Sequence, residues 1–464
     1  MQASTGAAED LMQVHASFER ISKANKGNMS LDQFQLQRTI GCGRYARVRL
    51  ATLKSETDIP ICLKVFKKKN VHLQEQCEHI INEKDVLASV HNPFIIHMLA
   101  TFQDVDRLYM ALELVNGGEL FTLLRERIKF TLPHARIYMA EMICAISHLH
   151  SLQICFRDVK PENILIHASG HLKLTDFGFA KYIKGGKTHT VCGTAVYMAP
   201  EILKPMKGDD TKSAGYGLEV DWYGLGILFY EMLNGKAPFV ASDFAGDQDI
   251  FQQTMTGFIR YPPGMDKSAT DCIKRLLHRE PNFRLGSVWS PYGKVQHHAC
   301  FASIDWEAAE TAQLEPPWKP DVQNSTVDTS FFGTFPESAD GISFFGQRRR
   351  SSRNSGGLRL SFTNSAFRGW EERCDFREEA LAVAARVSEE VAIFFDRKRI
   401  AKEAENMQLS IKETGESLVT SIKETGDSLV TSIKEISLTE DQKVDIVRTP
   451  HVGKESGKGC CTMQ

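Results

Sequence analysis

The sequence predicts an α+β fold with two lobes, an antiparallel sheet with one main helix followed by a mostly helical lobe. Three observations predict it. Strand-like apolar runs dominate residues 34–114, helical spacings dominate residues 115–301, and Asn116-Gly117-Gly118-Glu119 lies between them as a hinge. The rest of the chain divides into an N-terminal helix at 1–33, a tail at 302–370, a helical repeat region at 371–440 and a flexible end at 441–464.

Composition places the chain among ordinary globular proteins of the cytoplasm. Of 464 residues, 42% are hydrophobic and 25% are charged, which is usual for a globular protein. The net charge of −2 gives no field that favours nucleic acid as a partner. The 11 cysteines are scattered without a CxxC pair, which indicates reduced thiols rather than a disulfide framework.

A glycine-rich hairpin opens the first lobe. Strand-like residues 36–40 and 48–52 flank Gly41-Cys42-Gly43-Arg44-Tyr45-Ala46. The glycines carry no Cβ, so the backbone can approach a phosphate closely. Ahead of the hairpin, residues 8–26 have apolar positions at helical spacing, which fits either an amphipathic helix packed on the main domain or a plain surface helix.

A strand at 59–66 comes after the hairpin and holds Lys64, and Glu83 comes later in a helical pattern. A lysine on a strand and a glutamate on the adjacent helix can pair, which fixes the lysine against nucleotide phosphates. The alternative is a surface lysine and a solvated glutamate. The spacing of the two residues favours the pair.

The second lobe begins after an apolar strand at 108–115 that ends at the hinge. This lobe is mostly helical, with two short strands joined by a tight turn. The expected helices cover 121–127, 132–149, 220–233 and 269–277, and the expected strands cover 164–167 and 171–174.

The stretch from 155 to 163, between the second helix and the first short strand, carries the side chains that phosphoryl transfer needs. Asp158 can accept a proton from a substrate hydroxyl, and Lys160 can neutralise a phosphoryl group in transfer. Asn163 can offer an oxygen to Mg²⁺. Asp176, directly after the second short strand, is placed to chelate the metal that bridges the nucleotide phosphates.

The order of these features resembles a eukaryotic protein kinase over residues 34–301. Within that family the chain is most similar to the AGC group, in particular to the catalytic subunit of cyclic-AMP-dependent protein kinase. This implies the two-lobed kinase fold and a serine/threonine kinase that uses ATP and Mg²⁺. The residues that carry the resemblance are Leu31-Asp32-Gln33-Phe34, Asn82-Glu83-Lys84, Gly117-Gly118-Glu119-Leu120-Phe121, Phe156-Arg157-Asp158, Asp176-Phe177-Gly178-Phe179-Ala180-Lys181 and Ala199-Pro200-Glu201.

The resemblance also implies a role for each matching position. Catalysis falls to Asp158 as base, to Lys160, and to Lys64 oriented by Glu83. The metal ligands are Asn163 and Asp176. The expected ATP-binding residues are Gly41, Cys42, Gly43, Arg44, Tyr45, Ala46, Val48, Cys62, Lys64, Glu113, Val115, Glu119 and Leu165.

Substrate choice depends on charge at matching positions. Glu119, Glu162 and Glu231 stand where the family binds arginines two and three residues before the phosphorylated site. Protein substrates with Arg-Arg-x-Ser/Thr sites are therefore expected. Glu119 and Glu162 could instead reach the ribose.

Thr190 falls at the activation-loop phosphosite of the family, the target of an upstream kinase. Arg157, Lys181 and His79 are placed to pair with the phosphate. The physical reason is that three cationic groups need a dianion to order them, and a phosphate provides charge-assisted hydrogen bonds.

The chain departs from the family pattern at several positions. Ala46 replaces the third loop glycine, and Cys62 replaces a small alanine over the adenine. His189 stands where the resembling subunit has a tryptophan that helps to dock its regulatory subunit, and Val196 replaces a glutamate in the same loop. Control by a cyclic-nucleotide-binding subunit is therefore left open, whereas catalysis is expected.

The tail beyond the kinase region resembles that of AGC kinases. Phe332 and Phe335 could reach back to the nucleotide cleft. Residues 367–371 resemble the hydrophobic motif that docks on the main helix of the first lobe, or are exposed aromatics in a loop. Residues 349–352, Arg-Arg-Ser-Ser, suggest autophosphorylation at Ser352, a pseudosubstrate, or a solvated basic linker.

An 11-residue repeat, 410–420 and 421–431, places its apolar residues on one helical face. That face suits a coiled coil or a helix lying on a membrane, and a duplicated disordered tail is the alternative. The tetrapeptide 461–464 fits a prenylation signal on Cys461, with Cys460 as a palmitoylation candidate. These features predict a kinase tethered at the cytosolic face of a membrane. A pseudokinase scaffold and a soluble kinase dimerised through its C-terminal helix are the alternatives.

Overall fold

The computed structural model describes the two-lobed region and parts of the tail. Several sequence expectations lie outside the described residues: most of the N-terminal helix, Arg44 and Tyr45 of the hairpin loop, the 349–352 and 367–371 motifs, the repeats, and Cys460 and Cys461. The described residues are 29–43, 46–54, 56–71, 74–183, 186–204, 215–240, 246–322 and 330–335, with the side chains of 56–59 and 74–76 left out.

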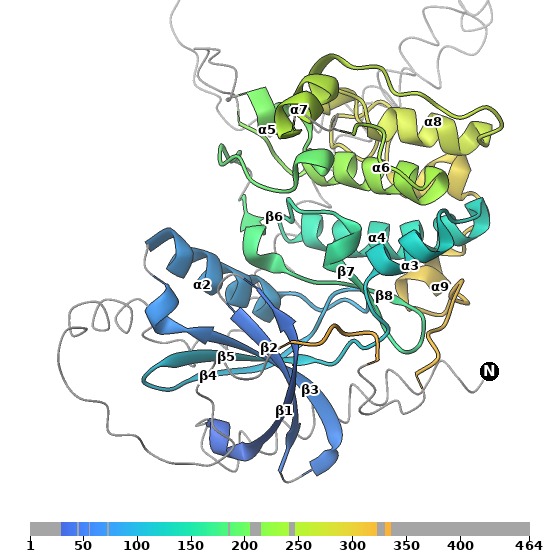
Figure 1. Cartoon of the computed structure of the whole chain (residues 1–464). Coiled ribbons are helices and arrows are strands. Elements are labelled where there is room, and N and C mark those ends of the chain that lie inside the picture. Colours follow the sequence, from blue (N-terminus) through green and yellow to red (C-terminus); the bar gives the residue numbers. More distant parts are fainter. Residues whose placement is uncertain are drawn as a thin grey trace, which may run out of the picture. The chain divides into compact units, whose positions relative to one another are not determined.

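The first lobe is a five-stranded antiparallel sheet in the order β1-β2-β3-β5-β4, with α2 along its side toward the helical lobe (Figure 1). The hairpin expected from the glycine pattern is β1–β2. The elements are η1 (Leu31–Gln33), β1 (Phe34–Cys42), β2 (Ala46–Leu53), β3 (Glu56–Lys67), η2 (Lys68–Asn70), α2 (Gln74–Ser89), β4 (Met98–Gln103) and β5 (Arg107–Glu113).

Side-chain alternation along β3 decides which residues face the other lobe. Successive side chains of a strand point to opposite faces of the sheet. Ile61, Leu63 and Val65 belong to a core on the outer face of the sheet, together with aromatic residues of β4 and β5. Cys62 and Phe66 belong to the main core, which continues into the helical lobe. Lys64 shares their face, which is why a charged residue of this strand points toward α2.

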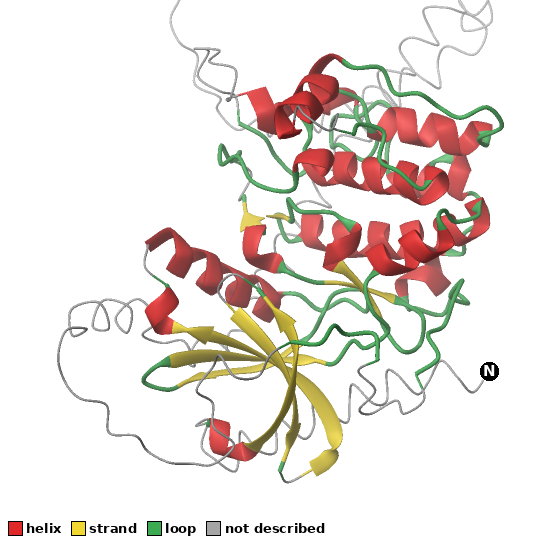
Figure 2. Ribbon diagram, in the orientation of Figure 1, coloured by secondary structure: helices red, strands yellow, loops and turns green. Residues whose placement is uncertain are grey.

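The second lobe is mostly helical, with two small two-stranded sheets, β6–β9 and β7–β8, on its side nearer the first lobe (Figure 2). Its longer helices are α3 (Leu120–Arg127), α4 (Leu132–Ser151), α6 (Glu219–Asn234), α7 (Gly246–Thr256) and α8 (Lys267–Leu276), with short α5 (Pro200–Leu203) and α9 (Trp306–Glu310). The short elements are β6 (Ile154–Cys155), η3 (Pro161–Asn163), β7 (Ile164–Ile166), β8 (Leu172–Leu174), η4 (Phe177–Phe179), β9 (Lys181–Tyr182), η5 (Ala195–Tyr197), η7 (Pro281–Phe283), η8 (Val295–His297) and η9 (Ala299–Phe301). No helix in the described part of the chain is long and apolar enough to span a bilayer.

Helix α6 is buried along most of its length and forms the centre of this lobe. Its glycines permit close packing: a Cβ on Gly226 would lie 2.8 Å from the Cβ of Leu276, on α8. A larger residue at 226 would push α6 and α8 apart, so the glycine sets their separation.

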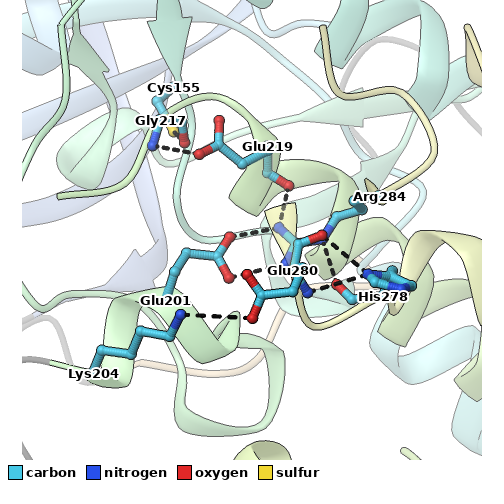
Figure 3. A network of polar contacts seen from close by, with 8 residues as sticks. All are labelled: Cys155, Glu201, Lys204, Gly217, Glu219, His278, Glu280 and Arg284. Atoms are coloured by element: carbon cyan, nitrogen blue, oxygen red, sulfur yellow. Dashed lines mark hydrogen bonds and ion pairs between the residues drawn. The ribbon is translucent and has the colours of Figure 1, made fainter. Parts of the chain in front are cut away.

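A buried ion pair fastens the chain after α8 to α5 (Figure 3). The guanidinium of Arg284 is fully buried and donates to both carboxylate oxygens of Glu201, at 2.5 and 2.9 Å. It also donates to the backbone oxygens of Glu219 and His278. All the charge of this arginine is therefore matched inside the protein, as a buried ion needs.

Candidate active site

The Lys64–Glu83 pair expected from the sequence is formed. Lys64 Nζ lies 2.5 Å from Glu83 Oε1, and both side chains are largely buried. Burial by itself lowers the pKa of Lys64, but the carboxylates of Glu83 and Asp176 outweigh it and the net shift is upward. Lys64 is therefore held as a cation beside Asp176, on the face of β3 that looks across to the second lobe.

Asp176 is positioned by its neighbour Phe177. The Phe177 ring is buried and packs edge-on against Phe156, with ring centroids 5.1 Å apart. With Phe177 anchored inward, the backbone of Asp176 adopts the left-handed conformation (φ 60°) and the residue remains exposed. An aspartate accepts this conformation more readily than most residues.

The carboxylate of Asp158 lies at the centre of a dense hydrogen-bond cluster. Lys160 Nζ donates to Oδ2 at 2.7 Å, and Asn163 Nδ2 donates to the same oxygen at 2.8 Å. Thr194 Oγ1 donates to Oδ1 at 2.8 Å and accepts from Lys160 at 3.0 Å. Asp158 is only 2% exposed, so these bonds fix its orientation.

The backbone ahead of Asp158 is held by Asp221, at the start of α6. Its Oδ2 accepts from the Phe156 N–H at 2.9 Å and its Oδ1 from the Arg157 N–H at 2.7 Å. Arg157 has a positive φ of 71°, which costs energy for a residue with a Cβ. The two bonds to a buried carboxylate offset that cost and fix the backbone that leads into Asp158.

Arg157, Lys181 and His79, which were expected to pair with a phosphate on Thr190, contact other groups of the segment that leads to Thr190. Arg157 donates to the carbonyl of Phe179 at 2.6 Å and to the hydroxyl of Tyr216 at 3.2 Å. That hydroxyl donates to the Thr190 carbonyl at 2.5 Å. The side chain of Thr190 is exposed.

The other two basic residues of this set contact neighbouring positions of the same segment. Lys181 donates to the hydroxyl of Thr188 at 3.2 Å. The ring of His79 packs edge-on against Phe179 at 6.3 Å. Asn82, on the same helix as His79, donates to the Ala180 carbonyl. Helix α2 is thus joined to the segment that carries Thr190.

The adenine candidates divide into apolar side chains and the stretch 113–115, which lies directly before the hinge. Val48 and Leu165 are partly buried and pack against the main core, to which Cys62 and Val115 belong. Burial raises the pKa of Cys62 to about 12, so this thiol stays protonated. The carboxylate of Glu113 instead faces His97 and Lys173, and the Glu113 N–H donates to the His97 carbonyl, so neither of these groups is directed at a ligand.

The three acidic residues expected to read arginine occupy different environments. Glu119 and Glu162 are exposed and close enough to interact: partial burial and the charge of Glu162 raise the pKa of Glu119. Glu231 is buried, accepts from Arg125 at 2.8 Å and from the hydroxyl of Tyr197. The tail returns to the first lobe, where Arg38 of β1 donates to the carbonyls of Phe332 and Gly333 at 3.3 and 2.9 Å.

The residues expected to bind metal fit Mg²⁺ chemically. Asn163 uses its amide nitrogen toward Asp158, at the side chain and at the carbonyl. Its side-chain oxygen then has no protein partner among the described residues. Asp176 offers an exposed carboxylate. Oxygen donors of these two kinds are what Mg²⁺ prefers, with water and phosphate oxygens completing the shell.

A family model described as "Protein kinase domain" matches residues 34–299. The chain belongs to the protein kinase family. It is 42% identical over 308 residues to the "cAMP-dependent protein kinase catalytic subunit PRKX" of Homo sapiens, covering 66% of this chain and 82% of the relative. It is 39% identical to the "cAMP-dependent protein kinase type 3" of Saccharomyces cerevisiae, covering 67% and 75%. A "cAMP-dependent protein kinase catalytic subunit" of Arthrobotrys oligospora is also 39% identical, covering 69% of this chain and 60% of the relative.

These matches confirm the two-lobed kinase fold and show that the chain is a protein serine/threonine kinase, which is a transferase. Kinases of this family use ATP and Mg²⁺. Sequence reasoning did not single out Thr194 or Asp221. The only signal for Thr194 was its place in Cys192-Gly193-Thr194, shortly before Ala199-Pro200-Glu201.

Proposed function

We propose that the chain transfers the γ-phosphoryl group of Mg·ATP to serine or threonine in sites of the Arg-Arg-x-Ser/Thr type. The observation that carries the proposal is the Asp158 cluster, in which Lys160, Asn163 and Thr194 hold one carboxylate in place. Beside it, Lys64 is paired with Glu83. Base, phosphate-binding cation and metal-ligating amide are thus all present, which favours an active enzyme over a pseudokinase scaffold.

Each residue has a step in this proposal. Asp158 accepts the proton of the substrate hydroxyl as the oxygen attacks, and Lys160 neutralises charge on the phosphoryl group in transfer. Lys64, kept in place by Glu83, binds the phosphates. Mg²⁺, when bound, neutralises charge on the phosphate oxygens, and Asn163 and Asp176 would hold it.

Specificity for basic sites rests on Glu119 and Glu162. They are exposed acidic neighbours, and a guanidinium between them would relieve their repulsion. The third acidic residue, Glu231, is buried and accepts hydrogen bonds from Tyr197 and Arg125, so we assign it a supporting role in substrate binding. A peptide with two arginines before serine is the matching substrate.

The test is a Mg·ATP phosphorylation assay on an Arg-Arg-x-Ser peptide and on the same peptide with both arginines replaced by alanine. The full chain should phosphorylate the first peptide and lose most activity on the second. Asp158→Asn should abolish turnover while Mg·ATP binding persists. Equal activity on both peptides contradicts the specificity, and Asp158→Asn with wild-type turnover contradicts the catalytic assignment.

We further propose that phosphorylation of Thr190 by an upstream kinase activates the enzyme, since its exposed side chain lies on a segment that Arg157, Lys181 and His79 contact. Thr190→Ala should stay poorly active after treatment with that kinase. Full activity of Thr190→Ala argues against the switch.

We propose that lipid on Cys461, assisted by Cys460 or the repeats, tethers the kinase to the cytosolic face of a membrane. It rests on the sequence motif, and Cys461→Ser should move the kinase to the soluble fraction. Dimerisation through the C-terminal helix is the alternative, tested by sedimentation of the same variant. The three relatives described above are all named as cAMP-dependent enzymes, so co-purification with a cyclic-nucleotide-binding subunit should be tested.

A further inference from the structure

Lys173 is a buried lysine outside the Asp158 cluster. It occupies the middle of β8 and is 7% exposed. Lysine is almost never buried unless its charge is matched. Its Nζ donates to Glu113 Oε1 at 2.9 Å and lies 3.4 Å from His97 Nδ1. The same Glu113 oxygen lies 3.0 Å from His97 Nδ1, so the three side chains form a closed triad.

The triad joins three segments that meet behind the hinge. Glu113 is the last residue of β5, His97 immediately precedes β4, and Lys173 belongs to β8. Backbone bonds reinforce the contact between the first two: the Glu113 N–H donates to the His97 carbonyl at 3.0 Å, and the His97 N–H donates to Glu113 Oε1 at 2.7 Å. The carboxyl end of β5 is thus fixed on both its main chain and its side chain.

Strand β8 provides a rigid anchor for this arrangement. Its Leu174 exchanges backbone hydrogen bonds with the segment before β4, donating to Phe94 at 2.8 Å and accepting from Ile96 at 3.0 Å. The next residue, Thr175, donates to the Asn163 carbonyl at 2.9 Å, and Asp176 comes directly after it. Lys173 therefore links the hinge to the strand that leads into the metal-ligating residues.

The direction of the Glu113 side chain determines which of its groups a nucleotide base could contact. With the carboxylate turned inward to Lys173 and His97, the main chain of residues 113–115 continues from the end of β5, whose Leu112 pairs with Cys62 of β3. The pKa of Glu113 supports this arrangement: burial would raise it, but Lys173 and His97 hold it well below its usual range. The carboxylate is thus a permanent anion that depends on its cation.

We propose that Lys173 is a positioning residue for adenine binding. It clamps Glu113 so that the main chain of residues 113–115, directly before the hinge, keeps the geometry the nucleotide base needs. Removing the cation leaves a buried carboxylate that must move toward water or take up a proton, and either change shifts the backbone of residue 113. Lys64, proposed to bind the phosphates, and the Asp158 cluster lie on other elements. This inference rests on the proposed Mg·ATP site.

The experiment compares Lys173→Met with Lys173→Arg in the full chain, using steady-state kinetics and direct binding of Mg·ATP. We expect Lys173→Met to raise the KM for ATP by about tenfold while kcat and the KM for peptide stay within about twofold. Lys173→Arg keeps the cation and should bring the ATP KM back to within about threefold of wild type. Lys204→Met is the matched control, because Lys204 forms an exposed ion pair with Glu280 at 4.0 Å, and its ATP KM should not change.

A purely structural role gives a different result: kcat falls with the folded fraction and the ATP KM stays at the wild-type value, which would overturn the inference. If Lys173→Met is insoluble, the double variant Lys173→Met/Glu113→Gln is used in its place, because it leaves no buried charge unpaired. Its ATP KM should still be about threefold above wild type, since the charge-assisted bonds are lost, and a wild-type KM contradicts the clamp. If the wild-type protein binds no Mg·ATP, the proposed site itself is refuted. If the variants bind Mg·ATP as tightly as the wild type does, only the role of Lys173 is refuted.

Discussion

Replacing Thr194 by valine tests whether the Asp158 cluster is catalytic. The substitution keeps the shape of the side chain and deletes its hydroxyl, which donates to Asp158 Oδ1 at 2.8 Å and accepts from Lys160 at 3.0 Å. A hydrogen bond to a charged group contributes about 1.5–3 kcal/mol. Since each 1.36 kcal/mol in the barrier is tenfold in rate, kcat should fall by about 10- to 100-fold.

The assay is steady-state phosphorylation of an Arg-Arg-x-Ser peptide at saturating Mg·ATP. The KM for ATP should change by less than about threefold, because Lys64 and the hinge are untouched. Thr194→Ser keeps the hydroxyl and should retain kcat within about threefold. A kcat for Thr194→Val within about twofold of wild type, or an equal loss in Thr194→Ser, would refute the reasoning.

Three other charged groups each give a testable prediction. Lys64→Met should lower kcat/KM for ATP at least about 100-fold, because it removes the phosphate-binding cation and leaves Glu83 buried without a partner; steady-state kinetics with folding checked by circular dichroism measure this, and a loss below about fivefold contradicts the role. Arg284→Met should lower the free energy of unfolding by about 3–5 kcal/mol, since it strands the Glu201 carboxylate in the core; urea denaturation tests it, with a change under about 1 kcal/mol as the contrary outcome. Glu119 has a raised pKa, so it protonates at a higher pH than an ordinary glutamate, and affinity for basic peptides should weaken as pH falls toward that pKa. In Glu119→Gln the KM for the peptide should be higher at neutral pH and should no longer depend on the titration of this residue. A variant whose pH profile equals that of the wild type contradicts the prediction.

Local patterns predicted most of the secondary structure. The hairpin and the four helices expected in the second lobe lie close to their expected limits, because each has strong periodicity or glycine punctuation. The main helix of the first lobe was expected as a helical pattern around Glu83, and Glu83 lies in α2. Strand β4 and helix α7 were not predicted. The sequence of α7 is polar with few apolar positions, and β4 is short and lacks clean alternation, so tertiary pairing decides both.

The chemistry-bearing residues were predictable where they lie close together in sequence. Asp158, Lys160 and Asn163 share one stretch, and each has a side chain whose chemistry is evident from its type. The Lys64–Glu83 pair was also predictable, because a strand followed by an adjacent helix brings these two residues together. In both cases local geometry limits the possible arrangements.

The sequence by itself predicted the family, the order of the lobes and the side chains that are candidates for the reacting groups. Only the tertiary structure decided what holds those groups in place. Thr194 reaches Asp158 across 36 positions, Asp221 reaches the backbone of Arg157 across 64, and Lys173 reaches Glu113 across 60. The physical reason is that a buried charge takes whichever partner the packed core brings within hydrogen-bond distance, and no local pattern along the chain encodes that choice.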